Sequence, residues 1–416
     1  MEVRSGFKFT EAGVLPQDWK VLNLSGVCSK ITDGTHDTPK PTREGIPFLT
    51  AIHVKENRID FKGCYYLPES VHKEIYKRCN PELNDVLMVN IGAGVATTAL
   101  VNVDYEFSLK NVALLKPDNS QISGPYLNYY QSTVKSKTIE SISSGGAQPF
   151  LSLGEIGQLL IAIPPKKAEQ DAIADVLCDV DAYIESLEEL ITKKQLIKQG
   201  CMQELLTGKT RMHGNVTKWY KSSLQHVASI SPGINKSISE MGQGTLYVTV
   251  QDLYDGTSIR VEKLGRIIVS QAEVEAKSLI PGDIVFGKSS VSRKGIGYPS
   301  QFLGSREAVV YTGFAYRVRA IKSIVNPTYL FYALRSKETR RWVIDNSQSS
   351  ALTNMNQSIA DAIPVRIPPI EEQKEIGEIL SEMDREIALM QGKLAKAYQL
   401  KKGMMQELLT GRIRLV

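Results

Sequence analysis

Residues 163–211 read IPPKKAEQDAIADVLCDVDAYIESLEELITKKQLIKQGCMQELLTGKTR, and residues 367–414 read IPPIEEQKEIGEILSEMDREIALMQGKLAKAYQLKKGMMQELLTGRIR. From Gln170 to Arg211 the first copy aligns without a gap to the second at an offset of 203 residues, with sixteen identities in forty-two positions. This period is too long for a solenoid, whose units have about 20–50 residues. It indicates a duplicated domain, each copy of which ends in the quoted stretch.

Apolar residues in both stretches recur at alternating steps of four and three, which is the seam of a coiled coil. A Pro-Pro pair precedes each stretch, and Gly208 and Gly411 follow, as at the two ends of a helix. About 40 residues at ~1.5 Å each predict helices of roughly 60 Å. The predicted helix-pairing residues are Ile173, Leu177, Val180, Ile184, Leu187, Ile191, Ile376, Leu380, Met383, Ile387, Met390 and Leu394.

The charges predict how these helices pair. Acidic residues gather in the first part of each copy and lysines in the last part, an order that suits the dipole of each helix. Parallel packing would place acid against acid, whereas antiparallel packing places the acidic half of each helix against the basic half of the other. We therefore expect an antiparallel pair. Two ordinary surface helices are the alternative, which the length of the seam disfavours.

The chain of 416 residues is long enough for two or more domains, and 42% hydrophobic with 23% charged residues is ordinary globular composition. No apolar run approaches the ~20 residues that cross a bilayer, and the polar start Met1–Arg4 is not typical of a signal peptide. Five scattered cysteines without a CxxC pair indicate reduced thiols. We expect a cytoplasmic protein without a membrane partner.

The segments between the predicted helices share a strand pattern. Tyr247-Val248-Thr249 corresponds to Phe48-Leu49-Thr50, and Asp283-Ile284-Val285 corresponds to Asp85-Val86-Leu87, while the loops between them differ. The predicted fold class is α+β: two mixed α/β globular domains, separated by two long antiparallel helices that form a coiled coil, with a pseudo-twofold internal repeat. The expected boundaries are residues 1–162, 163–211, 212–366 and 367–416.

Residues 212–369 hold 19 Lys and Arg against 11 Asp and Glu, a net charge of +8, which makes an anionic partner such as nucleic acid plausible. The loops of both domains are rich in donors of the kind that contact phosphates and base edges. A basic cluster in residues 335–341 suits a phosphate backbone. The candidate DNA-binding residues are Lys30, Thr35, His36, Arg43, Asn90, Gln148, Lys288, Ser289, Ser290, Arg293, Lys294, Arg335, Lys337, Arg340, Arg341, Gln348, Asn354 and Asn356.

The segments that match catalytic motifs lack the neighbouring residues or elements that those motifs require. Gly282–Ser289 matches GxxxxGK[ST], but a phosphate-binding loop needs a helix after it, and a basic strand-to-loop turn is the better interpretation. Asn326-Pro327-Thr328-Tyr329 lacks the second proline of the Asn-Pro-Pro-Tyr signature of amino-methyltransferases and is interpreted as a helix-opening turn. Five histidines show no metal spacing. We expect no catalytic residues, no metal and no cofactor in this chain.

Two variable domains, each followed by a helix that starts after Ile-Pro-Pro and ends Gln-Glu-Leu-Leu-Thr-Gly, resemble the specificity (S) subunit of type I restriction-modification systems. Gly13–Trp19 is similar to the domain opening of that family, from which Gly214–Trp219 departs. The resemblance implies target-recognition domains at 1–162 and 212–366 that each read one half of a bipartite double-stranded DNA site. The helices at 163–211 and 367–416 would set the gap and dock two methyltransferase (M) subunits.

The resemblance also implies that this chain is not an enzyme. Methylation with S-adenosylmethionine would belong to M, and ATP- and Mg-dependent cleavage to restriction (R) subunits that join through the M–S complex. Two other hypotheses remain: a self-contained methyltransferase or nuclease with a cryptic site, and a scaffold without a nucleic-acid role.

Overall fold

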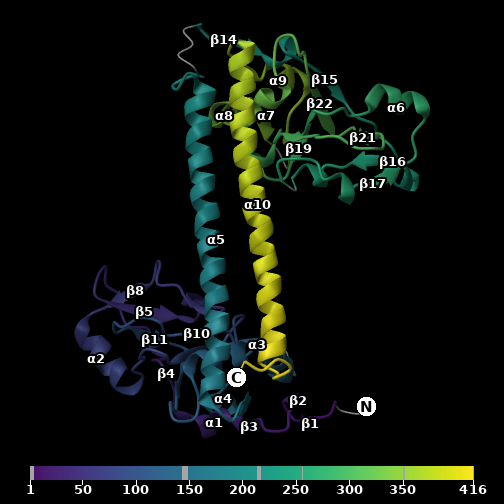
Figure 1. Cartoon of the computed structure of the whole chain (residues 1–416). Helices are drawn as coiled ribbons and strands as arrows, with labels where there is room; N and C mark the ends of the chain where they lie inside the picture. The colour runs from purple at the N-terminus through teal and green to yellow at the C-terminus, as the bar shows by residue number, and fades with distance from the viewer. Residues whose placement is uncertain (1–3, 143–148, 213–216, 255, 350–351, 416) are drawn as a thin grey trace. The chain divides into compact units, whose positions relative to one another are not determined.

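The computed structural model describes residues 4–142, 149–212, 217–254, 256–349 and 352–415. Its contacts divide the chain into two units, residues 1–188 with 393–416 and residues 189–392. Each unit holds one globular domain together with parts of two long helices, α5 (Lys167–Thr207) and α10 (Ile370–Leu408), shown in teal and yellow in Figure 1. Both helices are continuous over 41 and 39 residues, close to the predicted length.

The first unit is built on two small sheets. A four-stranded antiparallel sheet has the order β10-β9-β12-β4, and a three-stranded sheet has the order β11-β5-β8, with β11 parallel to β5. The strands are β4 (Cys28–Asp33), β5 (Ile46–Thr50), β8 (Tyr65–Leu67), β9 (Val86–Val89), β10 (Thr98–Leu100), β11 (Ser108–Lys110) and β12 (Val112–Pro117).

Short ribbons and helices complete this unit. Strand β3 (Lys20–Asn23) pairs with β13 (Leu160–Ile163), which leads into α5. The other strands are β1 (Phe7–Thr10), β2 (Gly13–Pro16), β6 (Val54–Lys55) and β7 (Arg58–Ile59); the helices are α1 (Leu24–Val27), α2 (Glu69–Arg78), α3 (Gly124–Ile142) and α4 (Leu153–Gln158). Helix α3 is the longest helix that the structure describes in this unit apart from α5 and α10, and its Tyr126 hydroxyl donates to the Ala162 carbonyl of β13 at 2.7 Å.

The second unit repeats this plan. Its sheets have the orders β15-β22-β18-β20 and β17-β16-β21, again with one parallel pair, β16 with β21, and β14 pairs with β25 before α10. The strands are β14 (Tyr220–Ser223), β15 (Ala228–Pro232), β16 (Met241–Val248), β17 (Gly265–Ile267), β18 (Ile284–Gly287), β20 (Ser300–Gln301), β21 (Val309–Tyr311), β22 (Ala315–Ala320) and β25 (Pro364–Ile367); the helices are α6 (Gln271–Lys277), α7 (Pro327–Arg335), α8 (Lys337–Asn346) and α9 (Gln357–Ala362).

The two long helices run antiparallel in both units. In the first unit Lys401 Nζ lies 2.5 Å from Asp181 Oδ1, so the end of α10 lies beside the start of α5. In the second unit Lys194 Nζ lies 2.8 Å from Glu386 Oε1, so the later part of α5 lies beside the earlier part of α10. The basic half of each helix meets the acidic half of the other, as the charges predicted. The expected fold class, two mixed domains with an antiparallel helical pair and an internal repeat, is confirmed.

The predicted seam divides between two environments. Ile184 and Leu187 are buried and pack with Val180, Leu394 and Ala397 in a small cluster between the helices. In contrast, Ile173 and Leu177 are part of the core of the first domain, while Ile376, Leu380 and Met383 pack with that of the second. Ile191 and Ile387 are also buried, and Met390 is half-buried. The first turns of each helix therefore belong to a globular core as much as to the helical pair.

Each domain is completed by the helix end of the other copy. Leu408, the last residue of α10, and the adjacent Leu409 lie in the core of the first unit with Trp19, and Leu205 and Leu206 of α5 lie in the core of the second unit. The glycine that follows each end adopts a positive φ, +66° at Gly411 and +74° at Gly208, which favours glycine over residues with a side chain. The repeated Leu-Leu-Thr-Gly is thus a closing segment for the domain of the opposite copy.

Candidate nucleic-acid interface

Four of the predicted donors share one small sheet in the second unit. Strand β24 (Thr353–Asn354) pairs on one side with β19 (Ser289–Ser290) and on the other with β23 (Gln348–Ser349). Asn354 is opposite both Ser289 and Gln348 in the register. Gln348 and Asn354 are exposed, and the serines are half-buried. The structure therefore brings together polar residues that lie more than fifty positions apart in the sequence.

The loop that follows β19, residues 293–297, is held by hydrogen bonds to its carbonyl oxygens, and we call it the clamped loop. The Arg340 guanidinium donates to the carbonyl oxygens of Gly297 at 2.7 Å, Ile296 at 2.6 Å and Lys294 at 3.1 Å, and the Tyr254 hydroxyl donates to that of Gly295 at 3.1 Å. Arg340 is buried, and burial lowers its pKa to about 10. The Arg340 guanidinium is therefore engaged within the protein and not exposed for a phosphate contact. It supports the loop that carries Arg293 and Lys294.

Two further candidates also have structural roles. Lys288 Nζ donates to the Gly313 carbonyl at 2.7 Å and lies 4.5 Å from the Tyr316 ring centroid, and desolvation lowers its pKa. Asn356 is the N-cap of α9, since its Oδ1 accepts the N–H of Ile359 at 2.9 Å. Both side chains hold the ends of loops in place. The prediction that they contact DNA directly assumed free side chains, and these two are already engaged within the protein.

Four of the candidate cations of this unit are exposed. Arg293 and Lys294 are exposed and make no side-chain hydrogen bond or ion pair within the described residues. The Arg341 side chain is 83% exposed, and its Nε lies 3.7 Å from Asp345 Oδ2. Lys337 is also exposed at the start of α8. Arg293, Lys294 and Arg341 reach solvent, which is what a phosphate contact requires.

In the first unit, the candidates Lys30 and His36 are linked to each other through Arg78 and Asp33. Lys30 Nζ donates to the Arg78 carbonyl at 2.8 Å, and the Arg78 guanidinium pairs with the buried Asp33. His36 Nε2 lies 3.0 Å from Asp33 Oδ2, and its Nδ1 lies 2.9 Å from Asn111 Oδ1. Thr35 is joined to β11 through its bridge with Lys110. Arg78 and Asn111 could not be predicted from the sequence, because each lies over 40 residues from its partners and no local pattern marks them.

Arg43 and Asn90 have no side-chain hydrogen bond or ion pair with this cluster among the described residues. Arg43 is exposed and makes no side-chain hydrogen bond or ion pair in the part of the chain that the structure describes. Asn90 is buried at the end of β9, and its Oδ1 has no partner among the described residues. Its carbonyl accepts the Leu151 N–H at 2.8 Å, and Ile91 is opposite Phe150. Gln148 lies outside the described residues.

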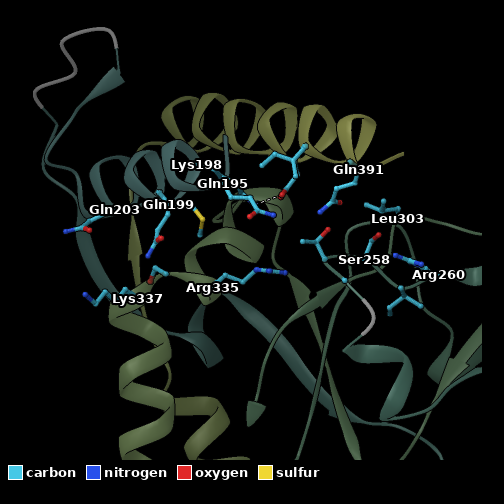
Figure 2. Close-up of a pocket in the computed structure, with 18 of the residues that line it drawn as sticks. Gln195, Lys198, Gln199, Gln203, Ser258, Arg260, Leu303, Arg335, Lys337 and Gln391 are labelled. Atoms are coloured by element: carbon cyan, nitrogen blue, oxygen red, sulfur yellow. Dashed lines mark hydrogen bonds and ion pairs between the residues drawn. The ribbon is translucent and has the colours of Figure 1, made fainter. Parts of the chain in front are cut away.

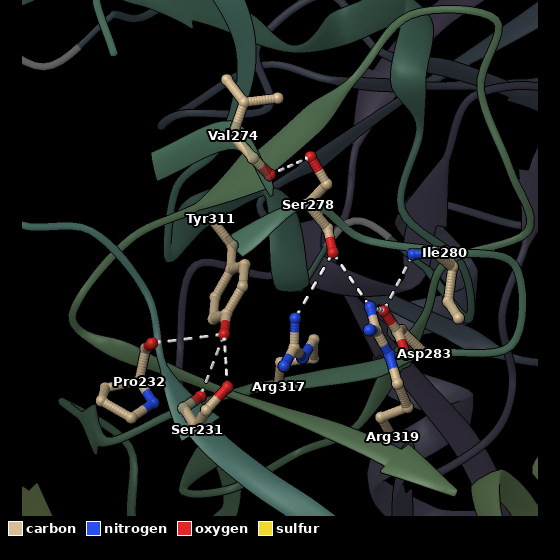
Figure 3. A network of polar contacts seen from close by, with 9 residues as sticks. All are labelled: Ser231, Pro232, Val274, Ser278, Ile280, Asp283, Tyr311, Arg317 and Arg319. Carbon is tan, nitrogen blue, oxygen red and sulfur yellow. Dashed lines mark hydrogen bonds and ion pairs between the residues drawn. The ribbon is translucent and has the colours of Figure 1, made fainter. Parts of the chain in front are cut away.

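The turn before β18 has a structural role. Asp283 is buried and accepts hydrogen bonds from the Ile280 N–H at 2.8 Å and from Arg319 Nη2 at 2.7 Å (Figure 3). Asp85 has the same place in the first unit, where its Oδ2 accepts the Glu82 N–H at 2.8 Å. A strand, Ser289–Ser290, and not a helix follows Lys288, so no phosphate-binding loop forms there. Asn326 caps α7, as its interpretation as a helix-opening turn predicted.

One serine-histidine-glutamate arrangement is present in the first unit. His72 Nδ1 lies 2.9 Å from Ser108 Oγ, and its Nε2 lies 2.9 Å from Glu106 Oε2. Ser108 and His72 are buried, so no substrate reaches the hydroxyl, and the contacts join α2 to β11. Within the described ranges, no three His, Cys, Asp or Glu side chains are grouped as metal ligands. Among the same residues, no helix is both long and apolar enough to span a bilayer.

The chain is similar to proteins of one kind. The family model described as type I restriction modification DNA specificity domain matches residues 16–199 and 218–399. A putative type I restriction enzyme MjaX specificity subunit from Methanocaldococcus jannaschii is 23% identical over 98% of this chain and 97% of its own length. The StySPI specificity subunit from Salmonella potsdam is 21% identical over 88% of this chain and 81% of its own length.

Solved structures show the same fold. The crystal structure of a type I restriction-modification S subunit from M. genitalium superimposes with a TM-score of 0.64 at 13% identity and covers 98% of both chains. A chain from a study of complex assembly and conformational transition in the type I system gives 0.53 at 15% identity and covers 96% of this chain and 99% of that one.

Because the family model matches most of the chain in two segments, the chain belongs to the family of type I restriction-modification DNA specificity domains. It is a specificity subunit, the non-catalytic member that recognises a DNA sequence for a type I restriction enzyme.

Proposed function

We propose that each unit reads one half of a bipartite double-stranded DNA site and that the antiparallel helices set the gap between the half-sites. The observation that carries this proposal is the pairing of Lys401 with Asp181 in one unit and of Lys198 with Asp384 in the other. The same two positions of the repeat are used in both, so the two readers are built on equivalent ends of an antiparallel pair.

The differing loops support two different half-sites. In the second unit the exposed donors are Gln348 and Asn354. Arg293 and Lys294 lie on the clamped loop, a few residues after β19. In the first unit the corresponding role falls to the exposed side chains of His36 and Arg43. Phosphate contacts would supply affinity, and side chains at base edges would supply the sequence.

The proposal extends to partners. Two methyltransferase (M) subunits would dock on the helices, each placed beside one half-site, since an adenine must be flipped out of the duplex before it is methylated. R subunits would join through the M–S complex. S-adenosylmethionine, ATP and Mg would then be bound by those partners. Exposed apolar side chains on the long helices, among them Leu190, Ile197 and Leu389, are suited to such docking.

The gap is tested by lengthening both helices. One heptad inserted after Leu190 of α5 and a matching heptad after Ala388 of α10 keep the seam in phase. Seven residues add about 10 Å, which corresponds to about 3 base pairs of duplex. Methylome sequencing of cells that carry the variant with its M partner should show both half-sequences unchanged and the gap longer by about 3 base pairs.

The matched control is a heptad in α5 alone, which breaks the pairing and should abolish methylation. An unchanged gap with both heptads in place contradicts the proposal. Methyl transfer by this chain without M would instead support a self-contained enzyme. Absence of salt-dependent DNA binding by the M–S complex would support a scaffold.

A further inference from the structure

A groove of about 1010 Å³ lies within the second unit. The later part of α5 and residues 384–391 of α10 form one wall, and the turn between α7 and α8 and residues 256–262 form the other (Figure 2). Along α5 the lining extends from Gln195 to Thr207, about 18 Å at 1.5 Å per residue. An extended peptide of five or six residues at ~3.3 Å each has this length.

Four side-chain amides lie on the helical wall. Gln195, Gln199 and Gln203 are spaced four residues apart, so they lie along one face of α5, and Gln391 adds an amide from α10. All four are exposed, and their side chains make no hydrogen bond within the residues that the structure describes. A carboxamide both donates and accepts, as a peptide group does, so a row of glutamines is complementary to an extended main chain.

The charges of the groove are balanced. Lys198, Arg260, Arg335 and Lys337 provide four cations, and Glu262, Glu338 and Asp384 provide three carboxylates. Lys198 is already paired with Asp384, and Glu338 with Arg366. A groove with an excess of one positive charge does not suit a phosphate backbone, which needs a run of unpaired cations. It suits a polar peptide.

Arg335 supplies a fixed donor in the groove. Its guanidinium lies 4.7 Å from the Tyr298 ring centroid and 5.1 Å from that of Phe331, and Nη2 donates to the Tyr298 hydroxyl at 2.6 Å. The remaining Nη1 is buried and has no partner among the described residues. In Figure 2 the side chain extends into the groove toward Ser258. An arginine held in this way is preorganised for one carboxylate.

The first unit differs at the equivalent positions. Tyr398, Lys402 and Gln406 stand where the second unit has Gln195, Gln199 and Gln203, and Glu188 stands where it has Gln391. The Tyr398 hydroxyl donates to Glu188 Oε1 at 2.6 Å, so two of the four positions are engaged with each other. The row of unengaged amides therefore belongs to the second unit, and a ligand that uses it distinguishes the two units.

We propose that this groove binds an extended segment of the methyltransferase subunit, whose main chain hydrogen-bonds to the glutamine amides and one of whose acidic side chains pairs with Arg335. This inference rests on the proposed function, which provides the partner. It adds that the two methyltransferase subunits are not held alike, because the segment is gripped at the second unit.

The test uses the full chain and its purified methyltransferase subunit. A photo-crosslinking residue, p-benzoylphenylalanine, replaces Gln199, and the matched control carries it at Lys402. With DNA absent and present, mass spectrometry should find crosslinks from position 199 to one continuous stretch of the methyltransferase that contains an acidic residue. The control should not crosslink to that stretch. Crosslinks from position 199 to DNA, or only within this chain, overturn the proposal.

Affinity gives the second readout. The triple variant Gln195→Ala, Gln199→Ala, Gln203→Ala should weaken binding of one methyltransferase subunit at least tenfold while the other binds as before, measured by calorimetric titration. Lys402→Ala with Gln406→Ala should change neither. Equal affinities for wild type and the triple variant, in a complex that still methylates DNA, refute the groove and leave the proposed function intact. A wild-type chain that binds neither DNA nor methyltransferase refutes the proposed function itself.

Discussion

Arg414 Nη2 lies 2.7 Å from Glu169 Oε2, although 245 residues separate them in the chain. Arg211 and Glu372 repeat this contact in the second unit, with Nη2 2.9 Å from Oε2. Both carboxylates are almost fully buried, with 1% of each side chain exposed. The end of one helix thus neutralises the buried glutamate at the start of the other, and positions that the repeat keeps identical are positions that close the opposite domain.

Removal of the Arg414 side chain should destabilise the first unit. Arg414→Ala leaves Glu169 buried without its partner, which costs about 2–3 kcal/mol after allowance for the 35% exposure of the arginine side chain. Arg412→Ala removes an exposed pair with Glu407 and should cost less than about 0.5 kcal/mol. Urea unfolding measures both free energies. Equal losses for the two variants would contradict the role given to Arg414.

The second unit should lose stability in acid through Glu372. Burial would raise the pKa of this carboxyl, but hydrogen bonds from Arg211, Trp219 and the Met212 N–H hold the pKa below its ordinary value of 4.5. The unfolded chain therefore takes up a proton at a higher pH than the folded chain does. The stabilisation is present above pH 4.5 and is lost as the pH falls through the lower folded pKa.

Glu372→Gln is the matching experiment for this pH dependence. The variant should be less stable than wild type at pH 7, and the difference should shrink as the pH decreases from 5 to 3. Urea unfolding at several pH values measures it. A constant difference over that range would show that Glu372 is not the group responsible.

The two closing glycines should differ in their tolerance of a methyl group. Both have positive φ, so alanine costs about 1–2 kcal/mol at either position. At Gly411 the added Cβ would also lie 2.5 Å from Pro16 and 3.1 Å from Trp19, whereas at Gly208 its nearest neighbour is Trp219 at 3.5 Å. Gly411→Ala should therefore be more destabilising by about 1–3 kcal/mol. Thermal unfolding that ranks the variants in the opposite order would refute this packing.

Arg340 and Arg341 are neighbours with separable roles. Arg340→Ala leaves three carbonyl oxygens of the 294–297 loop without their donor, so we expect a loss of about 2–4 kcal/mol of stability and weaker discrimination between DNA sequences. Arg341→Ala should leave stability within about 0.5 kcal/mol and lower the salt dependence of DNA binding by about one phosphate contact. Binding titrations at several salt concentrations distinguish the two.

The helical pair could be predicted from the sequence because its determinants are local. The spacing of Ile184, Leu187 and Leu394 is periodic, and the separation of acidic from basic residues indicates the direction of pairing. The exchange of helix ends could not be predicted in this way. Leu205 and Leu408 occur in the same sequence, Gln-Glu-Leu-Leu-Thr-Gly. Only the three-dimensional course of the chain decides which domain each leucine packs into.

The candidate interface was harder to predict for a related reason. Arg335, Lys337, Arg340 and Arg341 read as one basic cluster, but helix α8 turns Arg340 inward to the loop at 294–297, while Arg341 faces solvent. Which arginine is buried depends on the course of that loop, and no pattern near residue 340 specifies it. Gln199 gave no signal, because a lone glutamine on a helix is ordinary until a groove forms beside it.

Because the first domain is completed by the end of the second long helix, it cannot finish folding until that helix has been translated. The first domain is complete in sequence by Ile163, yet Leu408 and Leu409, which cover its core beside Trp19, leave the ribosome some 245 residues later. At 5–20 residues per second this delay is roughly 10–50 s. Throughout that interval the nascent domain keeps an uncovered apolar face, so chaperones have access to the first half of the chain until its last helix has been made.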